Sequence, residues 1–147
     1  MEFVETIALS WVDIARDAEL LAAKLRPLKR RWKGIIAITR GGLIPAAMLA
    51  RKLDIRMIDT ACAVSYAGKQ QGKVKMLKCP PGDGQGWLVV DDIADSGKTL
   101  KALRKHLPRA FFVTIYAKPV GKPLVDIHGV EIDQEAWLIF PWETGED

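Results

Sequence analysis

The stretch WLVVDDIADSGKTL, from Trp87 to Leu100, is the part of the sequence that most clearly indicates the fold class. Its apolar beginning is short and continuous, which is typical of a buried parallel strand. Asp91 and Asp92 follow, and open α/β sheets place their ligands at the carboxyl ends of such strands. Gly97 then opens a segment that we predict to be helical. The alternative is that this stretch is a strand, an acidic turn and a helix with no functional role. That alternative does not explain why acids, small residues and a glycine occur together here.

The loop between the acid pair and the predicted helix is suited to binding a phosphate group. Backbone N–H groups at the start of a helix have no partner within the helix and attract anions. Ser96 and Thr99 add hydroxyl donors, and Lys98 adds positive charge. The run Gly97-Lys98-Thr99 also ends the P-loop motif, but that motif needs a glycine five positions before Gly97, where this chain has Asp92. A carboxylate there would repel the bound phosphates, so we exclude a P-loop.

Apolar strands alternate with helices along the rest of the chain. The expected helices cover residues 11–25, 45–53 and 97–107, the first of them capped by Ser10 and Asp13. The first helix has an apolar stripe made of Trp11, Ile14, Ala18, Leu21 and Leu25. The expected strands cover residues 35–38, 55–64, 86–91, 111–117 and 136–140. This alternation favours an α/β fold, with a mostly parallel twisted sheet flanked by helices, in a single domain over residues 1–147.

Composition narrows the class of protein. Hydrophobic residues make up 49% of the 147 residues and charged residues 27%, which is typical of a globular chain. The apolar runs are too short to span a bilayer, and the first residues have no basic segment of the kind that begins a secretory signal. Cys62, Cys79, His106 and His128 fit no zinc or disulfide pattern. The net charge of +4 suits an anionic ligand, nucleic acid or an anionic membrane surface, or has no specific role. We therefore expect an intracellular, cytoplasmic protein.

Further short stretches occur in an order that points to one family. They are Trp32-Lys33-Gly34-Ile35-Ile36-Ala37, Arg40-Gly41-Gly42, Ser65-Tyr66, Phe112-Val113-Thr114-Ile115, Ala117-Lys118-Pro119, Pro123-Leu124-Val125-Asp126 and Pro141-Trp142. With these and the stretch from Trp87 to Leu100, the chain resembles the type I phosphoribosyltransferases, and in particular the bacterial xanthine-guanine enzymes. The resemblance implies the type I fold with a small C-terminal hood. It also implies that the phosphoribosyl group of phosphoribosyl diphosphate (PRPP) is transferred to xanthine, guanine or hypoxanthine, giving the nucleoside 5′-monophosphate and diphosphate.

The resemblance implies a PRPP site built from two loops. Asp91 and Asp92 match the acids near the ribose hydroxyls and Mg²⁺, with Asp92 as the metal ligand, and carboxylate oxygens suit both partners. The run Ser96-Gly97-Lys98-Thr99 matches the loop that holds the 5′-phosphate. Arg40 and Gly41 match the diphosphate loop, which in relatives contains a non-proline cis peptide. Taken alone, Arg40-Gly41-Gly42 is equally well read as an ordinary turn.

The resemblance also implies a purine site. Asp95 matches a catalytic acid near PRPP and N7 of the base, where a carboxylate can accept a proton and stabilise positive charge on the sugar. Lys118 matches a lysine that contacts O6 of the base. Trp137 matches the aromatic residue that stacks on the purine, and Leu138 the residue whose backbone carbonyl meets the edge of the base. Without the family, the lysine would be expected at the surface and the tryptophan in the core. After Leu138, the apolar pair Ile139-Phe140 replaces polar residues of relatives.

Residues 65–75 match the flexible loop of the family. They are polar and contain glycines and lysines, which predicts a mobile loop or a loose hairpin that orders when PRPP binds. Ser65 and Tyr66 match its beginning. Relatives have an arginine where this chain has Gly72, so Lys69 or Lys73 is expected to replace that arginine.

Three other classes of protein use similar features. A non-catalytic PRPP-sensing regulator has the same fold, an RNA-binding regulator would use the basic run Lys29-Arg30-Arg31, and a metal-dependent phosphohydrolase would use the acids of the motif. The combination of Asp95, Lys118 and Trp137 favours the phosphoribosyltransferase over these alternatives. We therefore expect no nucleic-acid partner. The resemblance further implies a homotetramer and weak peripheral association with the inner membrane.

Overall fold

Buried apolar strands form the centre of the molecule. The computed structural model describes residues 5–65 and 73–143. Strands β2 (Gly34–Thr39), β5 (Trp87–Ala94) and β6 (Phe111–Ala117) lie side by side, and β2 and β6 are buried along almost their whole length. Apolar residues on both faces suit a parallel strand that is covered on both sides. The three central strands that the sequence predicts are therefore confirmed.

The described residues form a main sheet in the order β4-β3-β2-β5-β6-β7. Its outer strands are β3 (Ile58–Ser65), β4 (Val74–Lys78) and β7 (Ile127–Glu131). All neighbouring strands run parallel except β3 and β4, which are antiparallel. This antiparallel pair agrees with the hairpin that was one of the two predictions for residues 65–75. The prediction of a mostly parallel sheet is confirmed. Tyr66, Lys69 and Gly72 lie outside the described residues.

Two strand boundaries differ from the sequence prediction by three residues. β3 begins at Ile58 rather than near residue 55, because Ile55 packs into the core and its N–H bonds to the carbonyl of Ala50. β5 continues to Ala94 rather than ending at Asp91, because this part of the strand also pairs with β6. β7 was not predicted, since its sequence IHGVE is short and interrupted by glycine and histidine.

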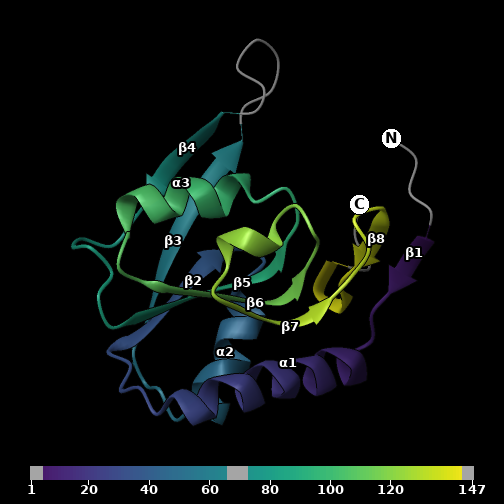
Figure 1. The fold of residues 1–147 in the computed structure, drawn as a ribbon, viewed down its shortest axis with the longest axis horizontal. Helices are drawn as coiled ribbons and strands as arrows, with labels where there is room; N and C mark the ends of the chain where they lie inside the picture. Colours follow the sequence, from purple (N-terminus) through teal and green to yellow (C-terminus); the bar gives the residue numbers. More distant parts are fainter. Residues whose placement is uncertain (1–4, 66–72, 144–147) are drawn as a thin grey trace.

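Helices cover both faces of the main sheet (Figure 1). On one face lie α1 (Trp11–Leu25) and α2 (Leu43–Lys52), and on the other lies α3 (Lys98–His106). Short 3-10 helices are η1 (Arg26–Leu28), η3 (Lys122–Leu124) and η4 (Pro141–Glu143). The capping box of Ser10 and Asp13 at the start of α1 is confirmed. Among the described residues, no helix is long and apolar enough to cross a bilayer.

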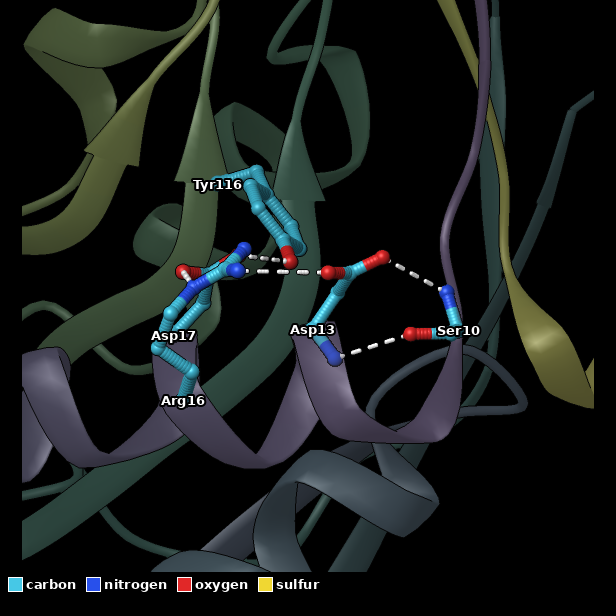
Figure 2. A network of polar contacts seen from close by, with 5 residues as sticks. All are labelled: Ser10, Asp13, Arg16, Asp17 and Tyr116. Carbon is cyan, nitrogen blue, oxygen red and sulfur yellow. Dashed lines mark hydrogen bonds and ion pairs between the residues drawn. The ribbon is translucent and has the colours of Figure 1, made fainter.

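The apolar stripe of α1 contains one buried charge that the sequence did not reveal as important. Asp17 is only 4% exposed, and its Oδ2 accepts a 2.5 Å hydrogen bond from the hydroxyl of Tyr116 on β6. The guanidinium of Arg16 donates to the same carboxylate over 3.0 Å, and it also pairs with Asp13 of the capping box (Figure 2). Burial and the Asp17 charge raise the pKa of Tyr116, which keeps its hydroxyl protonated as a donor. This network fixes α1 on the sheet.

Replacing Asp17 with Ala should lower the free energy of unfolding by about 2–3 kcal/mol, because it leaves the buried hydroxyl of Tyr116 without an acceptor. Tyr116→Phe should cost only about 1 kcal/mol, since the Asp17 carboxylate keeps Arg16 as a partner. Urea unfolding of the two variants and of the double variant measures this. Additive losses in the double variant would show that the two groups are not coupled.

A second, two-stranded sheet forms the hood. β8 (Ala136–Ile139) pairs in parallel with β1 (Glu5–Ala8), with Glu5 opposite Ala136 and Ala8 opposite Ile139. The sequence predicted β8 but not β1, so the hood contains an N-terminal strand in addition to the C-terminal segment. Phe140 belongs to the apolar pair that replaces polar residues of relatives. Its apolar character is explained by its packing, because it is buried and stacks on Trp142 with ring centroids 4.8 Å apart.

Candidate active site

The candidate site lies where three neighbouring parallel strands end. Residue Ala37 of β2 is opposite Val90 of β5, and Ala94 of β5 is opposite Ala117 of β6. The loops that follow these strands therefore emerge at one edge of the sheet. They carry Arg40, Asp95 and Lys118, which the family resemblance places in one site.

The acid pair lies in the last half of β5. Asp92 is almost fully buried, and Asp91 is largely enclosed although a small part of the residue reaches the surface. Each carboxylate accepts a hydrogen bond from the next backbone N–H, at 2.8 Å for Asp91 and 2.7 Å for Asp92. Burial raises the pKa of Asp91 well above its ordinary value, and the charge of Asp92 raises it further. Burial also raises the pKa of Asp92. Hydroxyl donors or positive charge from a ligand would favour the ionised form of both groups.

The loop after β2 packs directly on the acid pair. The peptide bond between Thr39 and Arg40 is cis, as the resemblance implied. A Cβ atom on Gly41 would lie 2.5 Å from Oδ2 of Asp92, and one on Gly42 would overlap the backbone carbonyl oxygen of Val90. Glycine is therefore required at both positions because the loop backbone lies so close to β5, and not because of an unusual backbone angle. The side chain of Arg40 is exposed and follows directly after β2.

The start of α3 is the segment that the resemblance expects to hold a phosphate. Gly97 precedes the helix with φ of 81°, a left-handed conformation that glycine adopts most readily. The N–H of Lys98 donates to the Ser96 hydroxyl over 3.4 Å, and no acidic residue lies in the first turn. A hollow of about 100 Å³ lies against this turn. It is lined by Asp91, Ile93, Asp95, Ser96, Gly97, Lys98, Thr99 and Leu100.

Lys118 differs most from the plain expectation for a lysine at the end of a strand. It is only 2% exposed, and its Nζ lies 3.3 Å from Oδ2 of Asp95. The N–H of Lys118 also bonds to the carbonyl of Ala94 over 2.9 Å, which joins the ends of β5 and β6. A lysine that is enclosed beside a carboxylate at the ligand-binding edge of a sheet is a functional candidate.

The hood presents alternating side chains. Trp137 is 46% exposed, whereas Leu138 is 7% exposed and belongs to the hydrophobic core. Alternation along β8 thus places the indole at the surface and the leucine side chain inside. The exposed indole does not fit the plainer reading of Trp137 as a core residue.

Comparison with known proteins agrees with this geometry. The model of the phosphoribosyl transferase domain matches residues 9–147. The chain belongs to the phosphoribosyltransferase family. It is 47% identical over 144 residues to a xanthine-guanine phosphoribosyltransferase of Desulfotalea psychrophila, covering 97% of this chain and 89% of that protein. It is 48% identical over 141 residues to the enzyme of that name from Chromohalobacter salexigens, covering 96% and 86%. The crystal structure of a purine phosphoribosyltransferase from Pyrococcus horikoshii has a TM-score of 0.80 at 27% identity, covering 98% and 97%.

In this phosphoribosyltransferase, most of the residues expected in the site lie on adjoining elements. The acid pair, the phosphate loop, the Arg40 loop and Lys118 all lie at the carboxyl ends of β2, β5 and β6. Ser65 ends β3, the next strand in the sheet, and Lys73 comes directly before β4.

Sequence reasoning missed one polar residue of the site. The side chain of Gln134 lies between Asp95 and the backbone of Val120. A glutamine in the turn before a short strand has no motif around it, so no signal in the sequence identifies it.

Proposed function

We propose that this protein is a purine salvage enzyme that transfers the phosphoribosyl group of PRPP to a 6-oxopurine and releases diphosphate. The proteins from Desulfotalea psychrophila and Chromohalobacter salexigens carry the name of this activity for xanthine and guanine. The observation that carries the proposal is the enclosed contact of Lys118 with Asp95, next to the phosphate loop. It puts a cation that suits O6 and an acid that suits N7 beside each other.

PRPP is proposed to bind along the edge formed by the three loops. The N–H groups at the start of α3, with Ser96, Lys98 and Thr99, would hold the 5′-phosphate. Asp91 and Asp92 would accept hydrogen bonds from the ribose hydroxyls. Arg40 would donate to the leaving diphosphate, because a guanidinium presents a planar fork of donors to phosphate oxygens.

The acid pair suits Mg²⁺. Mg²⁺ usually binds one or two carboxylates together with water and substrate phosphates, and buried carboxylates with raised pKa values gain from a nearby cation. Within the described residues, no group of three or more His, Cys, Asp or Glu could hold a metal ion. We assign Asp92 as the protein ligand of Mg²⁺. When bound, the ion would neutralise negative charge on the diphosphate.

Base recognition follows from the chemistry of Lys118. An ammonium group donates hydrogen bonds and cannot accept them, so it matches the O6 acceptor of xanthine, guanine and hypoxanthine but not the amino group of adenine. Trp137 would stack on the ring, and the backbone carbonyl of Leu138 would meet its edge. Asp95 would accept the proton that the base loses at N7 as the bond to the sugar forms.

A steady-state assay of diphosphate release tests the proposal. With PRPP and Mg²⁺, we expect turnover with xanthine, guanine or hypoxanthine and none with adenine. A protein that binds PRPP but releases no diphosphate with any purine would instead be the non-catalytic regulator. Diphosphate release with adenine alone would contradict the role of Lys118.

Replacing Trp137 with Ala should raise the KM for the purine about 10-fold or more, and the KM for PRPP much less. Stacking of a base on an aromatic side chain is worth about 1–3 kcal/mol. Trp32→Ala is the matched control, since Trp32 packs on Phe111 at the opposite end of the strands and should affect stability rather than either KM. Equal shifts of both KM values in Trp137→Ala would mean that the indole supports the fold.

The remaining expectations belong to the same proposal. The segment that begins at Ser65 and includes Lys73 would close over the reacting centre and exclude water. A homotetramer, a cytoplasmic location and weak association with the inner membrane are supported by the family resemblance alone. Sedimentation of the purified protein, with and without lipid vesicles, measures the first and the last.

A further inference from the structure

Gln134 joins three segments of the site through one side chain. Its Oε1 accepts a 2.8 Å hydrogen bond from the N–H of Val120, in the turn after β6. Its Nε2 donates to Oδ1 of Asp95 over 3.4 Å, in the loop after β5. Gln134 itself lies two residues before the start of β8, the hood strand that carries Trp137. One amide therefore connects the proposed catalytic acid, the β6 turn and the hood.

The orientation of this amide is fixed by its partners. A backbone N–H can only donate and an ionised carboxylate can only accept, so Oε1 must face Val120 and Nε2 must face Asp95. A flipped amide would lose both hydrogen bonds. The donor of Gln134 is thus committed to Asp95.

The β6 turn gives this donor a firm support. Gly121, next to Val120, lies so close to the end of β5 that a Cβ atom there would overlap the carbonyl of Ala94 and lie 2.7 Å from the carbonyl oxygen of Asp95. The backbone that holds Oε1 of Gln134 is therefore packed against the backbone that carries Asp95.

We propose that Gln134 is a positioning residue for Asp95, an inference that rests on the proposed catalytic role of Asp95. The Asp95 side chain is 48% exposed, so water competes for both of its oxygens. Lys118 contacts Oδ2 and Gln134 contacts Oδ1. When a purine binds, Lys118 is needed at O6, and Gln134 then keeps the carboxylate turned toward N7.

Gln134→Glu separates positioning from support of the hood. Glutamate has nearly the same size and can still accept from the N–H of Val120, but it offers no donor to Asp95 and adds a negative charge beside it. A hydrogen bond to a charged group is worth enough to change a rate by roughly 10-fold or more. We expect kcat to fall by about 10-fold, with an unchanged KM for PRPP and an unchanged melting temperature. An unchanged kcat in this variant would overturn the inference.

Two further variants complete the test. Glu135→Gln changes an exposed residue of the same turn and should keep full activity, so a loss there would overturn the assignment to Gln134. In an Asp95→Asn background, the amide at position 95 can donate a hydrogen bond and the carboxylate introduced by Gln134→Glu can accept it. Adding Gln134→Glu to this background should therefore cause no further loss of kcat. A further loss equal to that in the wild-type background would mean that Gln134 acts elsewhere. If the Asp95→Asn variant keeps a normal kcat, the proposed role of Asp95 fails as well. If Asp95→Asn lowers kcat but Gln134→Glu keeps the wild-type kcat, only the proposed role of Gln134 is overturned.

Discussion

Asp95→Asn is expected to lower kcat by about 10²-fold or more, as for other positioned acid–base groups, while the affinity for PRPP changes little. The reaction develops positive charge on the sugar while the purine loses a proton, so a carboxylate near both is useful twice. Asn keeps the size of the side chain and can still bond to Lys118, but it has no charge and cannot take the proton. Steady-state kinetics with saturating purine measures the change.

The two other acids of the motif should respond differently. Asp91 and Asp92 are proposed to bind ribose hydroxyls and Mg²⁺, so their Asn variants should mainly raise the KM for PRPP. Asp83→Asn is the control, because Asp83 is an exposed acid that pairs with Arg109 outside the candidate site. If Asp95→Asn loses only PRPP affinity, then Asp95 is a third binding acid, and contacts to the diphosphate must carry the rate.

Local signals in the sequence were sufficient for the central architecture. The capping box of Ser10, the apolar runs of β2 and β6, and the glycine before α3 depend on neighbouring residues, and the structure has all of them. Pairing between distant segments was not predictable in this way. β1 has no strong strand pattern of its own, and it forms because Thr6 pairs in register with Trp137, far along the chain.

The candidate site shows the same division. The motif from Asp91 to Thr99 is contiguous, so its strand, loop and helix could be predicted as a unit. The burial of Lys118 could not, because sequence alone would place a lysine that ends a strand in solvent, and its Nζ contacts Asp95, 23 residues away in the sequence. The polar role of Gln134 was also hidden, since its two partners lie 14 and 39 residues away in the sequence.

Gly42→Ala should raise the KM for PRPP by about 10-fold or more and should lower the free energy of unfolding by about 3 kcal/mol, since overpacking costs 1–3 kcal/mol and occasionally more. The added methyl group would overlap the carbonyl oxygen of Val90 and lie 2.8 Å from that of Ile38. Both are backbone atoms in the centre of the sheet, so they cannot turn aside as a flexible side chain could. The loop that carries Arg40 must move away from the acid pair instead, which separates the proposed diphosphate site from the ribose site.

Gly82→Ala is the matched control for this effect. Gly82 has φ of 93° but nothing within 4 Å of an added Cβ, whereas Gly42 has an ordinary φ of −85° and close neighbours. The control should cost about 1–2 kcal/mol through backbone strain and should leave both KM values unchanged. Urea unfolding and PRPP titration of the two variants separate strain from steric overlap. If Gly42→Ala keeps its stability and its KM for PRPP, the loop after β2 can accommodate the added methyl group. Close contact between the backbones would then not be what holds the Arg40 loop at the acid pair.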